Sequence, residues 1–184
     1  MVHQKTIVKE MQQDVKRLNT ITDRFSKIGS QPALVQENVN EVLFDSIDYL
    51  KKRSSRNVQY ELQMPDEPLY AQMSKPLFDW VIENLCKNAI DAMEGKGQIS
   101  VEMREIPEGL TIDITDTGKG IPKANFATVF EPGYTTKSRG WGLGLSLCKR
   151  IIENYHKGKI YVFRSEAGKG TTFRIELPVQ NTNE

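Results

Sequence analysis

The sequence holds little cysteine, little net charge and no long apolar run. Only two of its 184 residues are cysteines, Cys86 and Cys148, and no metal-ligand spacing surrounds them. Both lie in apolar helical patterns, so we expect packed thiols in a reducing compartment rather than a disulfide scaffold. The formal net charge of +1 gives no global field that would recruit nucleic acid, so any phosphate binding must be local.

A membrane-spanning or secreted class is also disfavoured. No stretch is long and apolar enough to cross a bilayer, and no secretory signal pattern opens the sequence. We therefore expect a cytoplasmic chain, with any membrane anchor of the natural protein outside this stretch. Hydrophobic content of 38% and charged content of 27% are typical of a globular protein. The length suits one ordinary domain with an appendage.

The appendage is predicted to be one amphipathic helix within residues 1–31. Apolar residues recur at alternating intervals of three and four, as at Val8, Met11, Val15 and Leu18, which makes a seam that needs another helix. No second helix of this type follows, so we expect a homodimer through this helix, or a partner helix from elsewhere. The stretch "GSQPAL" ends the helix and sets the predicted domain boundary between residues 31 and 32.

Residues 32–184 are predicted to form an α+β domain. Period-two alternation indicates strands at 57–64, 97–106, 109–116, 159–166 and 170–178, with a possible short strand at 68–73. Helical periodicity indicates helices at 38–54, 74–93 and 144–156, the first with Asn38 and Glu41 as a capping box and the second capped by Ser74. Hairpins dominate, which predicts a two-layer sandwich: a mixed, mostly antiparallel sheet covered by helices on one face.

Three polar stretches stand out from this pattern. "NLCKNAIDAM" places Asn84 and Asn88 one turn apart on one face of an apolar helix. An unpaired buried amide costs about 1–3 kcal/mol, so both side chains need a partner. "DTGKGIP" places Asp116 at the exit of a strand, before a flexible turn. "RGWGLGLSL" brings free backbone amides to a helix start, which is typical of anion sites, with Lys137 adding positive charge.

Each stretch alone has an ordinary explanation. A helical Asn is most often solvated or bonded to its own backbone, and Asp before glycines is common in turns. The glycine-rich loop has neither the Walker spacing nor the preceding strand of the dinucleotide fingerprint, so both of these familiar phosphate loops are excluded. Only the combination of the three stretches favours one binding site.

In this order and spacing, the stretches resemble the boxes of the Bergerat ATP-binding fold. That superfamily includes DNA gyrase, heat-shock chaperone ATPases, mismatch-repair ATPases and two-component histidine kinases. "NLCKNAIDAM" resembles its asparagine box, "DTGKGIP" its first glycine box, "VFEPGYTTK" its phenylalanine box and "GWGLGL" its second glycine box. "GKGTTF" is similar to its closing strand.

The resemblance implies ATP and Mg²⁺ as cofactors and assigns roles to the residues. Asp116 would accept a hydrogen bond from the adenine amino group, and Asn88 would coordinate Mg²⁺ through its amide oxygen. Asn84 and Lys137 would lie in the phosphate region as catalytic residues, and the stretch between the two glycine boxes would be a mobile ATP lid. The full implied binding set is Asn84, Asn88, Asp116, Gly118, Gly120, Ile121, Thr136, Lys137, Gly140, Gly142, Leu143, Gly144, Leu145 and Thr172.

Asn84 decides between branches of the superfamily. The ATP-hydrolysing members and the serine kinases carry a glutamate general base at this place, and an amide cannot take a proton. The pattern therefore resembles a sensor histidine kinase, which would transfer the γ-phosphoryl of ATP to a histidine of its dimerisation hairpin and onward to a response-regulator aspartate. The first helix resembles the second helix of that hairpin, and the acceptor-bearing helix is expected upstream. The alternatives are a Bergerat ATPase or serine kinase, and a non-enzymatic dimerisation module that keeps the fold.

Overall fold

The computed structural model describes residues 32–136 and 142–178 of the chain. The chain separates into two compact units, Met1–Ala33 and Leu34–Glu184, and the fold described below is that of the second. The predicted helix within residues 1–31 lies outside the described residues, and so does the predicted dimer contact through it.

The core of the fold is one five-stranded sheet with the order β2-β4-β5-β7-β6. Strand β2 pairs with β4 in parallel, and all other neighbours in this sheet are antiparallel. The predicted mixed, mostly antiparallel sheet is therefore confirmed. The strands span Val58–Gln63 (β2), Gly97–Ile106 (β4), Gly109–Asp116 (β5), Lys159–Glu166 (β6) and Gly170–Pro178 (β7).

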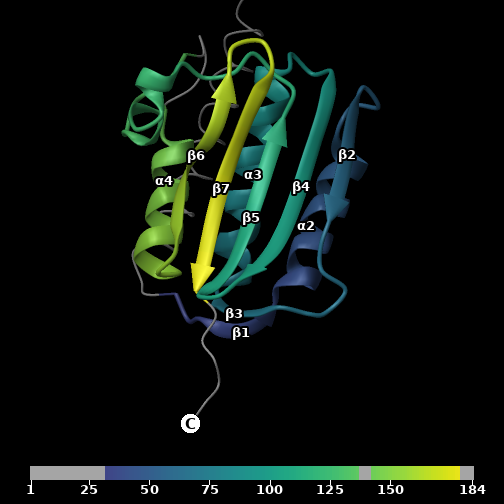
Figure 1. Cartoon of the computed structure of the whole chain (residues 1–184), viewed down its shortest axis with the longest axis vertical. Coiled ribbons are helices and arrows are strands. Elements are labelled where there is room, and N and C mark those ends of the chain that lie inside the picture. The colour runs from purple at the N-terminus through teal and green to yellow at the C-terminus, as the bar shows by residue number, and fades with distance from the viewer. Residues whose placement is uncertain (1–31, 137–141, 179–184) are drawn as a thin grey trace, which may run out of the picture. The chain divides into compact units, whose positions relative to one another are not determined.

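Helices cover one face of this sheet (Figure 1). Helix α3 runs behind the central strands, α2 lies against β2, and α4 lies against β6. The bounds are Val39–Arg53 for α2, Lys75–Ala92 for α3 and Gly144–Arg150 for α4. A π-helical turn, Ile151–Tyr155, extends α4, where the sequence predicts one continuous helix. Two 3₁₀ turns, Lys123–Asn125 and Thr128–Phe130, lie between β5 and α4.

A small second sheet forms beside the main one. Strand β1, Val35–Asn38, pairs antiparallel with β3, Tyr70–Met73. The sequence predicts β3 but not β1, because "VQEN" carries no alternation that distinguishes it from a linker. The pairing fixes the entry into α2, since Val39 N–H donates to the Leu69 carbonyl at 2.8 Å.

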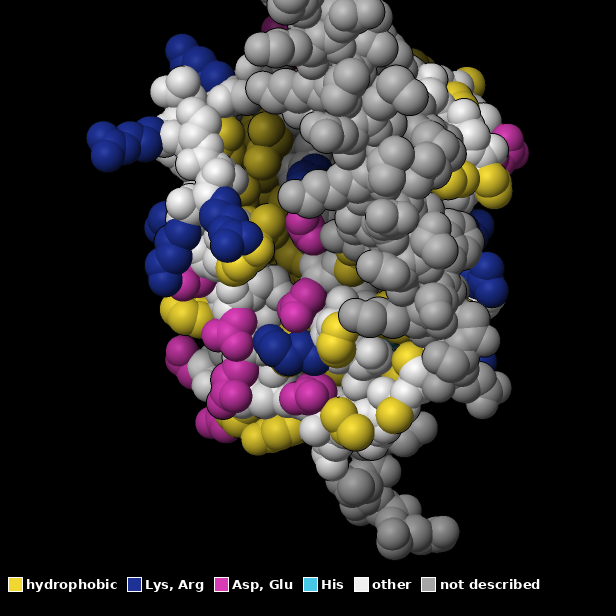
Figure 2. All heavy atoms as spheres, turned by 180° about the vertical axis from the view of Figure 1, so that it is seen from behind, with side chains coloured by type: hydrophobic (Ala, Val, Ile, Leu, Met, Phe, Trp, Pro, Cys, Tyr) yellow, Lys and Arg dark blue, Asp and Glu magenta, His cyan; other side chains and the backbone are white. Residues whose placement is uncertain are grey.

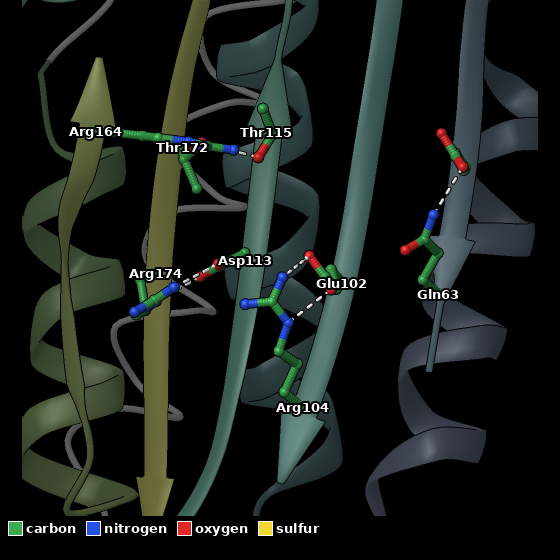
Figure 3. Close-up of polar contacts among 9 residues, drawn as sticks. Gln63, Glu102, Arg104, Asp113, Thr115, Arg164, Thr172 and Arg174 are labelled. Carbon is green, nitrogen blue, oxygen red and sulfur yellow. Dashed lines mark hydrogen bonds and ion pairs between the residues drawn. The ribbon is translucent and has the colours of Figure 1, made fainter. Parts of the chain in front are cut away.

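Alternation along the strands separates an apolar inner face from a polar outer face. On β5, Ile112 and Ile114 are buried beneath the helices, and Asp113 between them faces outward. Arg174 of β7 binds the Asp113 carboxylate with two nitrogens, each at 2.7 Å (Figure 3). The Arg174 guanidinium also stacks on the Phe163 ring at 3.5 Å. This polar cluster lets the sheet expose its outer face without leaving buried charges unpaired.

The starts of the helices show which capping predictions hold. Asn38 caps α2, since its side-chain oxygen accepts from the N–H groups of Asn40 and Glu41 at 3.1 and 3.4 Å. Glu41 bonds the Asn38 side-chain amide at 3.0 Å, whereas a capping box would have it bond the backbone N–H. Ser74 precedes α3, but its side chain makes no capping bond. The backbone N–H of Ser74 instead donates to Nε2 of the buried His156 at 3.1 Å.

The helix-covered face is charged at its surface. Figure 2 shows Asp and Glu side chains gathered around basic ones on this face. Between helices α2 and α3, Lys75 lies 3.4 Å from Asp45, and within α3 it lies 4.0 Å from Asp79. Exposed ion pairs of this kind contribute about 0–1 kcal/mol each, so the stability of the helix layer comes from the apolar side chains beneath it.

Candidate functional site

Asp116 ends strand β5, and the residue is only 4% exposed. Its Oδ1 accepts the Gly118 N–H at 2.8 Å, and the backbone N–H of Thr171 is a second donor. Burial raises the pKa of the Asp116 carboxyl, and these two hydrogen bonds oppose the rise. An ionised carboxylate has about four acceptor positions, so Asp116 retains capacity for a donor from a ligand.

The glycine loop, residues 117–122, is held from two sides. The Lys119 N–H donates to the Ala92 carbonyl at the end of α3 at 3.0 Å, and the Lys119 carbonyl accepts from Gly168 in the β6–β7 turn at 2.9 Å. At Gly120, φ is +77°, and a Cβ would collide with the Glu166 carbonyl. Only glycine fits this close, left-handed position. The end of β5 and the β6–β7 turn lie at the same end of the sheet in Figure 1.

Asn84 and Asn88 lie at the edge of the buried stripe of α3, and both are half-buried. Asn84 donates from Nδ2 to the Trp80 carbonyl one turn back, at 3.2 Å. The Asn84 amide oxygen faces the first residue of α4. Asn88 lies one turn closer to Ala92, and therefore closer to the anchored glycine loop, at about 1.5 Å of helix rise per residue.

Helix α4 begins in close contact with Asn84. A Cβ at Gly144 would lie 2.8 Å from the Asn84 Oδ1, so the glycine is what allows α4 to approach α3 here. Leu143, just before α4, provides no side-chain cap, and the N–H groups in the first turn of a helix can bind an anion. Leu143 and Leu145 are half-buried, and Thr136 is exposed. The Gly133 N–H donates to the Gly142 carbonyl at 2.9 Å, which joins the backbone on either side of residues 137–141.

Two of the predicted phosphate-region residues, Lys137 and Gly140, lie outside the described residues, and so do residues 137–139 of the predicted lid. The described part of the predicted set falls into two groups around α3. Asp116, Gly118, Gly120 and Ile121 lie near its C-terminal end. Asn84, Gly142, Leu143 and Gly144 lie near its middle, and Asn88 lies between the two groups.

The structure does not bring the Thr172 hydroxyl to Asp116. Thr172 faces outward, where its hydroxyl lies 2.9 Å from that of Thr115 and accepts from Arg164 Nε at 3.2 Å (Figure 3). The neighbouring Thr171 points to the helix side and contacts Asp116 through its backbone. The register of Ile114 opposite Phe173 explains this: Thr171, not Thr172, shares a face with Asp116.

Sequence reasoning missed Thr171 and also Ser165. Ser165 Oγ accepts the Ile121 N–H at 2.7 Å and lies 2.8 Å from the Thr171 hydroxyl. Period-two alternation from Asp116 through the β5–β7 pairing could have found Thr171. No sequence signal finds Ser165, because a β-bulge between Val162 and Arg164 shifts the alternation of β6.

The acidic residue next to Asn84 on α3 does not take the place of the glutamate base that other branches carry at that position. The adjacent Glu83 carboxylate pairs with Lys87 at 2.6 Å, one turn along its own side of α3. Neighbouring helix positions point about 100° apart. The Glu83 side chain therefore points in a different direction from the Asn84 side chain, which lies against the start of α4. This agrees with the expectation of an amide rather than a carboxylate at that place.

The donor set fits a cation that relies on its ligand for most of its shell. Across residues 32–136 and 142–178, no group of three His, Cys, Asp or Glu side chains is placed to hold a metal ion. An all-protein cage is therefore absent from this part of the chain. Mg²⁺ bound to a nucleotide needs only one or two protein oxygens, with phosphates and water as the remaining ligands. The half-buried Asn88 amide can supply such an oxygen.

The cysteines play no part in this site. Cys86 and Cys148 are both free and buried. Burial raises the pKa of the Cys86 thiol to about 12 and raises that of Cys148 as well. Both are therefore packed, inert thiols, as the sequence predicts. Within the described ranges, no helix combines the length and apolar character that crossing a bilayer requires.

Comparison with known proteins gives consistent matches along the domain. Residues 74–181 match the family of histidine kinase-, DNA gyrase B- and HSP90-like ATPases. Sporulation kinase E of Bacillus subtilis (strain 168) is 36% identical over 177 residues, which cover 93% of this chain and 23% of that kinase. The chain spans 23–38% of the length of the first curated relatives that it matches.

Solved structures show the same fold. The catalytic domain of the histidine kinase ThkA superposes with a TM-score of 0.71 at 28% identity, covering 79% of this chain and 95% of that domain. The structure of ThkA in complex with the response regulator protein TrrA superposes with a TM-score of 0.75 at 25% identity. That match covers 92% of this chain and 49% of the matched one.

Proposed function

The chain belongs to the family of histidine kinase-, DNA gyrase B- and HSP90-like ATPases, and we propose that it is the ATP-binding catalytic part of a sensor histidine kinase. The observation that carries the proposal is the convergence of two groups on α3. The acceptor Asp116 and its anchored loop lie at the C-terminal end of α3. Asn84, near the middle of α3, lies against the start of α4. The two groups suit the two ends of a nucleotide, a base and a polyphosphate.

The proposed role of Asp116 is recognition of the adenine amino group. The carboxylate is buried, partly satisfied by backbone donors, and held by a loop that is fixed on both sides. Hydrogen bonds to a charged group are worth about 1.5–3 kcal/mol. A guanine would present an oxygen to the same carboxylate, which disfavours it.

At the phosphate end, Asn88 would supply the protein oxygen for a nucleotide-bound Mg²⁺, and the first turn of α4 would face the phosphates. Asn84 would hold the start of α4 in place while offering no base to water. An ATP molecule in such a site stays intact until a nucleophile arrives. A neutral imidazole is nucleophilic at pH 7, so a histidine acceptor fits this site better than a water or a serine.

The acceptor and the partners follow from the kinase proposal. The acceptor histidine would lie on a dimerisation hairpin to which residues 1–31 contribute one helix, and the phosphoryl group would pass to an aspartate of a response regulator. The solved complex of the related ThkA with TrrA supports a partner of this class. An ATPase or serine kinase is disfavoured by Asn84. A non-enzymatic module is disfavoured by the arrangement of Asp116, Asn84 and Asn88 around α3.

The test separates nucleotide binding from turnover. Calorimetry should show ATP binding that Mg²⁺ strengthens in the wild-type chain, and ADP release in the same samples should be negligible. In Asn88→Leu, the strengthening by Mg²⁺ should be lost while Mg²⁺-free ATP binding persists. Rapid ADP release without any acceptor would support the ATPase alternative, and a folded chain that binds no ATP would contradict the proposal.

A further inference from the structure

The Ser165 hydroxyl, at the end of β6, connects the glycine loop to the start of β7. It accepts the Ile121 N–H at 2.7 Å, lies 3.0 Å from the Gly170 carbonyl, and lies 2.8 Å from the Thr171 hydroxyl. Its three partners come from two segments that both contact Asp116. A single half-buried hydroxyl therefore joins the loop on one side of Asp116 to the strand on the other.

Counting donors fixes the direction of these hydrogen bonds. A hydroxyl has one hydrogen to donate and two lone pairs that accept. The Ile121 N–H can only donate and the Gly170 carbonyl can only accept, so the Ser165 hydrogen goes to Gly170. The Thr171 hydroxyl then donates to Ser165, and every polar atom of the cluster is satisfied. The Thr171 oxygen is thereby left as an acceptor.

This acceptor lies beside the Asp116 carboxylate. Thr171 and Asp116 follow the register of Thr172 with Thr115, so both point to the helix side of the sheet. The Thr171 N–H bonds Asp116, and Gly170 packs so closely on the Asp116 carbonyl that no Cβ fits there. Two acceptors, one charged and one neutral, are thus fixed next to each other. The amino group of adenine carries two hydrogens to donate.

We propose that Ser165 is a positioning residue for the nucleotide base, which orients the Thr171 hydroxyl and the glycine loop so that Thr171 and Asp116 together accept from the adenine amino group. The proposal rests on the proposed function, since it requires that the site bind ATP. Ser165 itself need not touch the nucleotide. Without its hydroxyl, the Thr171 O–H is free to turn and the Ile121 N–H loses its acceptor.

The test compares two nucleotides on one set of variants. Calorimetry with Mg²⁺ would measure the affinities for ATP and for purine riboside triphosphate, which lacks the amino group. Ser165→Ala should lower the affinity for ATP about tenfold, the scale of one to two lost hydrogen bonds. It should lower the affinity for the analogue less than about twofold. Ser165→Thr, which keeps the hydroxyl, should bind ATP with the wild-type affinity. Tyr161→Phe, which removes a β6–β7 hydrogen bond to Glu176 on the outer face, is the matched control and should leave both affinities unchanged.

Other outcomes would overturn the proposal for Ser165 or the proposed ATP-binding function on which it rests. If Ser165→Ala lowers the affinities for both nucleotides equally, the role of Ser165 is structural only. If the affinity for ATP is unchanged, Ser165 has no role in binding. Thr171→Val removes the same acceptor and should show the same split, so it decides the matter if Ser165→Ala fails to fold. The double variant should be no weaker than the poorer single one. A wild-type chain that does not bind ATP would contradict the proposed function instead.

Discussion

Asp116 and His156 are buried ionisable side chains that the fold holds in opposite ways. Asp116 is surrounded by donors and keeps acceptor positions for a ligand. His156 is fully engaged: its Nε2 accepts from Ser74, and its Nδ1 lies 2.9 Å from the Ile151 carbonyl. Because the Ser74 backbone N–H can only donate and the Ile151 carbonyl can only accept, the ring is neutral with its proton on Nδ1. One residue is therefore suited to binding and the other to structure.

Nucleotide affinity should fall on acidification at a higher pH than an ordinary carboxyl would cause. Burial raises the pKa of Asp116 above 3.8, and protonation removes the acceptor that the adenine amino group needs. Calorimetry of ATP binding between pH 7 and pH 4 should show this loss in the wild type but not in Asp116→Asn, which binds weakly throughout. The loss is not unfolding by this group, because an acid with a raised folded pKa stabilises the fold as pH falls through that value.

Identical pH profiles for the wild type and Asp116→Asn would contradict this role. Asp116→Ala should weaken ATP binding about tenfold to a hundredfold, given the strength of a charged hydrogen bond. An unchanged affinity in that folded variant would remove the assignment altogether.

The stability of the domain should decrease as the pH falls below about 6.5, and His156 should account for part of the loss. Burial lowers the pKa of His156 from 6.5, and a proton on Nε2 would face the Ser74 N–H. The unfolded chain then binds more protons than the folded one, so stability falls with pH from the unfolded pKa downward, by up to about 1.4 kcal/mol per pH unit. Thermal unfolding between pH 7.5 and 5 should show a weaker pH dependence in His156→Asn. Equal slopes in both proteins would rule out His156 as the cause.

At the scale of elements, α3 organises the site. Its N-terminal end is tied to His156, its middle contacts α4 through Asn84, and its last carbonyl, that of Ala92, accepts from the glycine loop. Leu85 and Cys86 are fully buried and fix the helix rotation that presents Asn84 and Asn88 at the edge of the core. The core thus sets the positions of both halves of the site.

Gly144→Ala should weaken ATP binding and lower the thermal stability. In an ordinary exposed helix this change stabilises by up to about 1 kcal/mol. Here the new Cβ would lie 2.8 Å from Asn84 Oδ1, so either α4 or the Asn84 side chain must move. Arg150→Ala, at the exposed end of the same helix, is the control and should change neither property. A Gly144→Ala variant that is more stable and binds ATP normally would show that the contact is unimportant.

The sequence predicts the hairpin strands well and their surroundings less well. Strands β4, β5, β6 and β7 match the predicted ranges because alternation between apolar and polar residues is strong there. Strand β1 and the parallel β2–β4 pairing depend on partners far along the chain, which local patterns do not reveal. Likewise, the Ser74 side chain makes no capping bond, and the Ser74 N–H donates to the buried His156. Only the tertiary fold brings these two residues together.

Residue type and spacing single out Asp116, Asn84 and Asn88 in the sequence. The structure places these residues around one helix, and their roles in binding stay predictions. The choice between Thr171 and Thr172 was not predictable from the motif alone, because it depends on which face of β7 meets Asp116. Ser165 could not be found, since its role arises from a β-bulge and a loop contact.

At the scale of the whole molecule, the proposed ATP binding and the proposed phosphoryl transfer have different requirements. Transfer needs an in-line nucleophile about 3–3.5 Å from the phosphorus, and His156 does not meet this need. It is 2% exposed, both ring nitrogens are engaged, and it lies at the Ser74 end of α3. Asn84 lies ten residues further along that helix, or about 15 Å at 1.5 Å per residue.

The chain alone should therefore bind ATP and Mg²⁺ without phosphorylating itself. His3 lies outside the described residues and has no acidic neighbour in the sequence, so it also lacks the residue that would activate it. Incubation with γ-labelled ATP should yield no acid-labile phosphate on the chain. A separate helical hairpin that carries an acceptor histidine should become labelled slowly, because the untethered hairpin has a low effective concentration at the site. Stoichiometric phosphohistidine at His3 or His156 would show that the acceptor is within the chain. Labelling of neither chain nor hairpin, with ATP bound, would instead favour a binding module that has lost its kinase activity.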